Sequence, residues 1–415
     1  MLSSAPPPRS EFWRQPDVLA VVETWLDGGR DRGSGSRSSA PAATLGGWRT
    51  ASVRSAGRRA GDVADRVVLH VGLPKTGTTF LQQLLWANRE RLLAADVHLV
   101  VTTMRELFDA ARDLTRDGSA DWRRLVDAVR ESPGTVVLSC EGLSAVPAEQ
   151  AQLALADLRP ADVRVVCTLR DPARVLPSVW QQHVRTGSTV ELAAFVAHVR
   201  DGMAWEWLPS TLDVLDAWSA GLRADQVRVV TVPRSRVDPS VFWHRFATAA
   251  DLDPGLATEV PPPANTSLPA VQVELLRRVN LALGDRRPLE QPRYRELVRP
   301  LQGPRAVARA TGTLAELTPD DHAWAADCAQ RLVEALRERG HLVLGDLEEL
   351  LPEPAGSAST AAPDATSDAD VASAAAGLAA DLLLALRAAR RDGGGAGHPA
   401  SRGPPRPQGR GGPRA

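Results

Sequence analysis

Residues 67–81 read VVLHVGLPKTGTTFL. An apolar run ends at Gly72, a glycine-containing turn follows, and Thr78 begins a segment in which apolar side chains recur with helical spacing. The turn holds Lys75, the only lysine of the chain; lysine and arginine together number 49, so the other 48 are arginines. A lysine in so arginine-rich a chain indicates a chemical role, because lysine is a compact point charge and arginine a planar fork.

A strand–turn–helix unit of this kind predicts a phosphate-binding site. The backbone N–H groups of the turn and the positive end of the following helix both attract anions. The spacing Gly72-x4-Gly77 fits the nucleotide-binding pattern GxxxxGK(S/T), but Thr78 follows Gly77 and the lysine stands at position 75. A lysine placed there can touch the atom that joins a 5′-phosphate to a transferred group. The competing interpretation is an ordinary strand–turn–helix with a solvated lysine.

The composition favours a globular protein over a nucleic-acid-binding or membrane protein. The 415 residues suffice for one large α/β domain or two smaller ones, and 43% of them are hydrophobic. A net charge of −1 gives no indication of a nucleic-acid partner. No apolar run approaches the roughly 20 residues that span a bilayer, and no signal peptide is recognisable, so we expect a cytoplasmic protein without a membrane span.

The sequence divides into three parts. Residues 1–65 are expected to be a mostly disordered N-terminal extension, because Pro, Ser and Gly are frequent there. Residues 66–350 alternate apolar runs with helical patterns, which predicts a catalytic α/β domain with a mostly parallel sheet covered on both faces. Residues 351–415 are a low-complexity tail with one Ala-rich helix at about 368–391. That helix docks on the domain, pairs with another copy in a homo-oligomer, or is marginal within a disordered tail.

Two charged residues directly follow predicted strands. Glu141 comes after the third strand and Arg170 after the fourth, where Asp171 and Pro172 open a helix. Ligands bind at the carboxyl ends of strands in α/β sheets, so both side chains are expected near the turn. Glu141 is either a general base or a residue that fixes the loop. The predicted strands are Arg66–Gly72, Val97–Val101, Thr135–Cys140, Val163–Leu169 and Val227–Val232.

The segment PKTGTTFLQ at residues 74–82 resembles the 5′-phosphosulfate loop of sulfotransferases that use 3′-phosphoadenosine 5′-phosphosulfate (PAPS), and the bacterial members most. The resemblance implies a P-loop-type three-layer sandwich. It also implies that Arg170 and Ser178 bind the 3′-phosphate of the donor. A strand-end His or Glu serves these enzymes as base; Glu141 is the candidate and His183 the reserve. The donor-binding loop residues would be Pro74, Lys75, Thr76, Gly77, Thr78, Thr79 and Phe80.

The resemblance implies sulfuryl transfer from PAPS to a hydroxyl or amine of an unidentified acceptor, either a carbohydrate or glycan, a lipid or a small metabolite. Lys75 would stabilise the bridging oxygen of the leaving 3′,5′-adenosine bisphosphate, and no metal is expected. The first alternative is a P-loop nucleotide or small-molecule kinase, with Thr79 on Mg²⁺ and Glu141 as its acid. The missing lysine after Gly77 argues against it. The second alternative is a non-catalytic nucleotide-binding protein.

Several other side chains carry weaker signals. Ser139 is a further candidate to face the donor phosphates, and His70, inside the first strand, is expected in the core. Asn265–Leu268 resembles an NxSL element of bacterial sulfotransferases, or it caps a helix. Three tryptophans either stack on the acceptor or belong to the core: Trp205, Trp207 and Trp218.

Overall fold

The computed structural model describes residues 64–115, 120–202, 210–234, 238–261, 267–286, 291–302, 313–354 and 366–394. The expected N-terminal extension therefore lies almost wholly outside the described residues. So do Trp205, Trp207 and Asn265, and the interpretations attached to them stay predictions.

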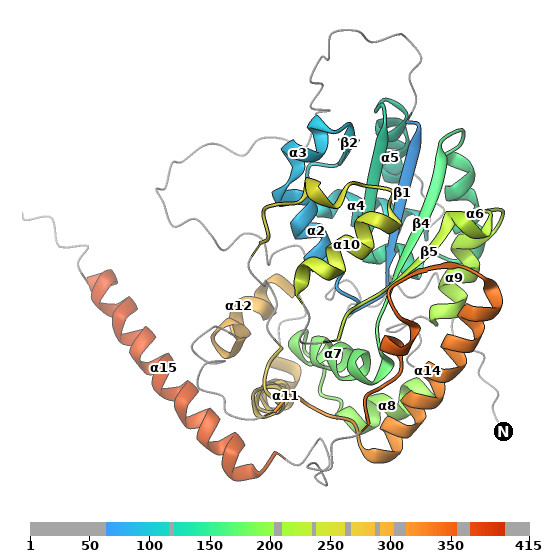
Figure 1. The fold of residues 1–415 in the computed structure, drawn as a ribbon. Coiled ribbons are helices and arrows are strands. Elements are labelled where there is room, and N and C mark those ends of the chain that lie inside the picture. The colour runs from blue at the N-terminus through green and yellow to red at the C-terminus, as the bar shows by residue number, and fades with distance from the viewer. Residues whose placement is uncertain are drawn as a thin grey trace, which may run out of the picture.

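Six parallel strands form the central sheet (Figure 1). They are β1 (Arg66–Gly72), β2 (Val97–His98), β3 (Thr135–Cys140), β4 (Asp162–Leu169), β5 (Val227–Thr231) and β6 (Leu342–Leu344). Their order in the sheet is β2-β3-β1-β4-β5-β6, and every pair runs parallel. The strand that leads into the lysine turn therefore lies between the strands that lead to Glu141 and Arg170. The expected α/β fold is confirmed.

The sequence predicted the middle of the sheet better than its edges. β2 ends at His98 and does not continue to Val101. The carbonyl oxygens of Leu99 and Val101 accept hydrogen bonds from the Arg89 guanidinium, at 2.8 and 2.9 Å, and not from a neighbouring strand. β6 was not predicted, because a strand of three residues gives no periodic signal.

Helices cover both faces of the sheet, because successive side chains of a strand point to opposite sides. Val68 packs with the helices of one face and Leu69 with those of the other. The first face carries α2 (Thr78–Ala87), α3 (Arg89–Ala94) and α10 (Pro239–Ala249). The second carries α4 (Met104–Leu114), α5 (Ala120–Arg130), α6 (Ala148–Asp157), α9 (Thr211–Ser219) and α14 (Pro319–Arg339). These layers make the three-layer sandwich.

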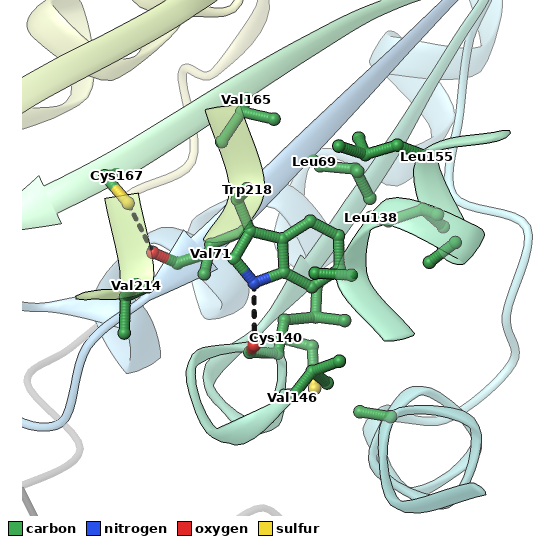
Figure 2. Packing of buried hydrophobic residues seen from close by; sticks show 14 of the residues in the cluster. Leu69, Val71, Leu138, Cys140, Val146, Leu155, Val165, Cys167, Val214 and Trp218 are labelled. Atoms are coloured by element: carbon green, nitrogen blue, oxygen red, sulfur yellow. Dashed lines mark hydrogen bonds between the residues drawn. The ribbon is translucent and has the colours of Figure 1, made fainter. Parts of the chain in front are cut away.

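Trp218 belongs to the core of the second face and is not free to stack on an acceptor. Its side chain is fully buried between α9 and the sheet, beside Leu69 and Val71 (Figure 2). The indole N–H donates to the carbonyl oxygen of Leu143 at 2.9 Å. A buried indole with its one donor satisfied is stable packing, so the core interpretation holds for this residue.

A third apolar cluster lies where the central strands end. Figure 1 shows α7, α8 and α11 grouped below the sheet, at the end where β4 passes into α7. Besides α14, the helices that contribute to this cluster are α7 (Pro172–Arg185), α8 (Leu192–Arg200), α11 (Ala270–Leu283), α12 (Gln291–Gln302) and α15 (Asp368–Gly394). Short 3-10 turns complete the fold: η2 (Glu141–Ala145), η3 (Ala224–Gln226), η4 (Pro254–Leu256), η5 (Gly284–Arg286) and η6 (Leu347–Leu350).

Candidate active site

The turn between β1 and α2 places two residues in the left-handed backbone region. Lys75 has φ +63° and Gly77 has φ +84°. Gly77 also has no room for a side chain, since a Cβ there would lie 2.6 Å from Cε1 of Phe242 on α10. The Thr76 hydroxyl closes the turn by donating to the carbonyl oxygen of Leu73 at 2.7 Å. A non-glycine residue with positive φ is uncommon, and such outliers gather at functional sites.

The start of α2 combines the positive end of a helix with a buried hydroxyl that has no protein partner. The first turn of α2 contains no acidic residue that would neutralise the positive end of the helix. The side-chain oxygen of Thr78 is buried and makes no hydrogen bond. A Cβ at Gly72 would collide with this oxygen, so the glycine permits the close approach. Free N–H groups and a hydroxyl at a helix start can hold a phosphate or sulfate.

Lys75 reaches from the turn to α7. Its Nζ donates to Oε1 of Gln182 at 3.0 Å. Burial lowers the pKa of Lys75 to about 8; the charge of Glu141 raises the pKa, and those of Arg185 and Arg170 lower it. The ammonium is therefore held in a place that penalises its charge, and an incoming anion would relieve that penalty.

Glu141 is the first residue of η2 and follows β3 directly. Burial raises the pKa of its carboxyl to about 7, while the positive charge of Lys75 opposes the rise. One carboxyl oxygen, Oε2, is buried and has no hydrogen-bond partner. A carboxylate with a pKa near neutrality and a free oxygen has the properties of a general base.

Arg170 lies against the loop from the side of β4. Its Nη1 donates to the carbonyl oxygen of Lys75 at 3.2 Å, and its Nε is buried without a partner. Burial lowers the pKa of this guanidinium to about 10. Asp171 begins α7 by accepting a hydrogen bond from the backbone N–H of Ala173 at 2.8 Å, as the sequence predicted. Ser178, two turns into α7, donates to the carbonyl oxygen of Arg174 at 2.8 Å.

His183 also lies on α7 and is a poor candidate base. Burial lowers the pKa of its imidazole to about 4, and the charge of Lys75 lowers it further. Its ring packs at 5.9 Å from the ring of Phe195 on α8. A base with so low a pKa takes up a proton weakly at neutral pH, so the structure favours Glu141 over His183 for this role.

Two features of the site carry no clear sequence signal. Gln182 contacts Lys75 only because α7 folds back over the loop, and a glutamine on a helix does not reveal such a contact beforehand. His70 is buried, as expected, but it is hydrogen-bonded to Ser139 with 2.8 Å between Nδ1 and Oγ. Ser139 is therefore engaged below the loop and does not face it as a donor contact.

A cavity of about 360 Å³ adjoins the loop on the side of α9 and α14. Its wall is mostly apolar, and both of its charged residues, Arg170 and Arg331, are cations. Lys75 and Glu141 do not line it, although both neighbours of Lys75 do. The lining residues are Leu73, Pro74, Thr76, Leu169, Arg170, Pro172, Val175, Leu176, Val199, Ser210, Thr211, Leu212, Trp324, Cys328, Arg331 and Leu332.

The fold is an α/β sandwich, and the loop at the carboxyl end of its central strand β1 has the properties expected of an anion-binding loop. Residues 65–211 match the family model of the sulfotransferase domain, which confirms the resemblance of this part of the chain to sulfotransferases, though not to the bacterial members in particular. The family's reaction is sulfuryl transfer. The matched range contains Lys75, Glu141, Arg170, Ser178 and His183. A search of curated proteins and a search of solved structures found no match.

Neither a metal-binding group nor a membrane-spanning helix is found among the described residues. No group of three or more His, Cys, Asp or Glu side chains in this part of the chain is arranged to hold a metal ion. No helix within the same residues is long and apolar enough to cross a membrane.

Proposed function

We propose that this protein transfers a sulfuryl group from PAPS to a hydroxyl or amine of an acceptor. The observation that carries the proposal is the pair Lys75 and Glu141 at the carboxyl ends of β1 and β3. Lys75 stands inside the anion-binding loop, where the bridging oxygen of a phosphosulfate would lie. Its neighbour Glu141 has the raised pKa and free oxygen that a base requires.

The donor would bind across the carboxyl ends of the three central strands. The backbone N–H groups after Lys75 and the unpartnered Thr78 hydroxyl would hold the 5′-phosphosulfate. Arg170, whose buried Nε has no partner, would bind the 3′-phosphate, and Ser178 would add a hydroxyl. Phe80 is half-buried and stacks on the buried Phe242 at 6.1 Å between ring centroids, and the Phe80 ring offers a surface for adenine on the face of α2 and α10.

The reaction is an in-line displacement at sulfur. The acceptor oxygen or nitrogen forms the new bond to sulfur while the bond from sulfur to the bridging oxygen breaks. Glu141 takes the acceptor proton, and 3′,5′-adenosine bisphosphate leaves with the bonding electrons. Lys75 stabilises the negative charge that develops on the bridging oxygen. Positioning and charge stabilisation therefore supply most of the acceleration, as in phosphoryl transfer.

We propose that the cavity beside the loop takes an apolar part of the acceptor. The aromatic pair lies on the opposite face of the sheet, so of the proposed donor contacts only loop residues and Arg170 adjoin this cavity. Its mostly apolar wall favours a lipid or an apolar metabolite over a free sugar. Leu212→Trp should fill the cavity and raise the KM for the acceptor while leaving donor affinity unchanged. A loss of donor affinity instead would assign the cavity to the donor.

A kinase fits the loop less well. Its pattern places a lysine after Gly77 to reach the β- and γ-phosphates, and Thr78 stands there. A non-catalytic nucleotide-binding protein would bind the donor but would have no use for a carboxyl like that of Glu141, with a pKa near 7.

The proposal is tested by incubating the full chain with ³⁵S-labelled PAPS and cell extract, with mass spectrometry to find the sulfonated product. We expect labelled product with the unaltered protein and none with Lys75→Ala, whose folding is checked by circular dichroism. Equal labelling with both proteins would reject the role of Lys75. No labelling with either, across extracts that supply sugars, lipids and amines, would reject the activity.

We further propose that residues 66–350 form the catalytic unit and that the protein acts in the cytoplasm. The sheet and the candidate active site lie within 66–350. The C-terminal helix α15 adds Val371 to the cluster beneath the site, so it supports this unit from outside the proposed boundary.

A further inference from the structure

A buried chain of hydrogen bonds lies directly below the loop, and the steps proposed above do not use it. His70 on β1 is fully buried. Its Nδ1 lies 2.8 Å from Oγ of Ser139 on β3, and its Nε2 lies 3.1 Å from Oγ1 of Thr168 on β4. The Thr168 oxygen is 2.8 Å from Oγ1 of Thr76, which belongs to the loop. The four side chains form one path across three neighbouring strands and into the loop.

The direction of this chain follows from counting protons. The carbonyl oxygen of Leu73 can only accept a hydrogen bond, so the Thr76 hydroxyl donates its single proton to it. Thr168 must then donate to Thr76, which leaves the oxygen of Thr168 as an acceptor toward His70. The imidazole therefore carries its proton on Nε2, and the unprotonated Nδ1 accepts from Ser139. Each proton in the path therefore belongs to one definite donor. Every hydrogen bond is donated in the direction that runs from Ser139 toward the loop.

This path of hydrogen bonds connects the three backbone segments that bear the proposed site residues. Thr76 follows Lys75, Ser139 precedes Glu141 by two residues, and Thr168 precedes Arg170 by two residues. The helix α2 joins the same system, since Nε2 of Gln82 donates to the carbonyl oxygen of Ser139 at 2.9 Å. Such a network is rigid when every member is satisfied, because buried hydrogen bonds are strong and an unpaired buried group is costly.

We infer that His70 is a positioning residue, which as the neutral Nε2–H tautomer sets the spacing of the loop against the strand ends on either side. The inference rests on the proposed function, because the residues it positions are those assigned to the donor and the base. A charged imidazole has two N–H donors and no acceptor, so it would lose the bond from Ser139. The surroundings keep the ring neutral: it is fully buried and packs edge-on against Phe246, at 5.0 Å between centroids.

The tautomer is measured by nitrogen NMR on the full chain with ¹⁵N-labelled histidine. The chain has 8 histidines, and the His70 signals are those missing from the spectrum of His70→Gln. We expect a neutral ring with the proton on Nε2 at pH 7. A proton on Nδ1, or an imidazolium, would overturn the inference. This measurement does not depend on whether the protein transfers a sulfuryl group.

Positioning is separated from packing by a matched pair of variants at Thr168, which has no assigned contact with substrate. Thr168→Val keeps the shape of the side chain and removes the oxygen that links His70 to the loop, whereas Thr168→Ser keeps that oxygen. We expect kcat to fall by about tenfold or more in Thr168→Val and to stay near wild type in Thr168→Ser.

Two outcomes of this comparison contradict the inference. One is a Thr168→Val protein that is less stable but turns over at the wild-type rate, which would mean that the chain only holds the core together. The other is equal loss in the Val and Ser variants. If the unaltered protein shows no turnover, the proposed function is rejected. The NMR measurement then still tests the proposed direction of the hydrogen bonds through His70.

Discussion

Among single residues, burial shifts the pKa values of Lys75 and Glu141 toward each other. Burial penalises the charged form of each, which lowers the pKa of the lysine to about 8 and raises that of the carboxyl to about 7. Their mutual attraction works against both shifts. In the free protein the charged pair therefore exists in a narrow pH range.

This pair predicts a narrow bell-shaped dependence of kcat/KM on pH. The rate should rise as Glu141 loses its proton through about pH 7 and fall as Lys75 loses its proton through about pH 8. Glu141→Gln should lower the rate and remove the acidic limb. The alkaline limb should move to lower pH, because the negative charge that raises the pKa of Lys75 is gone. An unchanged acidic limb in Glu141→Gln would show that another group is the base.

The burial of His70 should make the stability of the folded protein depend on pH, separately from the pair Lys75 and Glu141. The unfolded chain binds a proton at this residue below about pH 6.5, whereas burial lowers its pKa in the folded protein to about 3. Stability is therefore lost as the pH falls through this window, by about 2 kcal/mol at pH 5. His70→Gln should lack this loss. Urea unfolding of both proteins at pH 7.5 and pH 5 measures it, and equal losses in the two would contradict the account.

At the scale of elements, the loop and its helix were the most predictable part of the site. Gly72 and Gly77 occupy positions where a Cβ would collide with a neighbouring side chain. Asp171 caps α7 as the sequence predicted. The contact of α7 with Lys75 through Gln182 was not predictable, because it depends on how the third cluster packs. The chain through His70 was missed for a similar reason, since the register of the strands decides which polar residues meet.

Gly77→Ala should damage the loop more than its backbone conformation alone requires. Alanine at φ +84° is strained, which costs about 1–2 kcal/mol, and its Cβ would also collide with Phe242. The control is Gly202→Ala, where φ is +71° but nothing lies within 4 Å of the new Cβ. We expect both variants to lose stability and Gly77→Ala alone to lose affinity for 3′,5′-adenosine bisphosphate. Equal affinity in the two would show that the loop does not bind the donor.

At the scale of the whole molecule, the C-terminal helix is part of the fold at its start. Val371 on α15 is buried against the third cluster, and Asp368 lies 2.8 Å from Arg278 on α11. Figure 1 shows the rest of α15 running away from the body, and Leu383 and Leu384 on it are exposed. The sequence predicted the helix. It did not predict which residues dock, because the alanine-rich faces of the helix look alike.

Val371→Asp should detach the start of α15. An unpaired carboxylate is costly in an apolar cluster, so the helix should leave its site and the cluster should lose stability. Hydrogen exchange at residues 368–380 should rise, and unfolding should occur at a lower urea concentration. The matched control is Leu383→Asp, an exposed position on the same helix, which should change neither. If Leu383→Asp instead dissociates a dimer in sedimentation, the projecting half of α15 pairs with another copy.

The loop around Lys75 is expected to bind 3′,5′-adenosine bisphosphate, the product left by the donor, without a metal ion, and not to bind a nucleoside triphosphate. Isothermal titration calorimetry of the full chain tests it most directly. We predict tight binding of 3′,5′-adenosine bisphosphate in the presence of EDTA, much weaker binding in Arg170→Ala, and no binding of ATP with Mg²⁺. Tight binding of ATP that requires Mg²⁺, with none of the bisphosphate, would contradict the account.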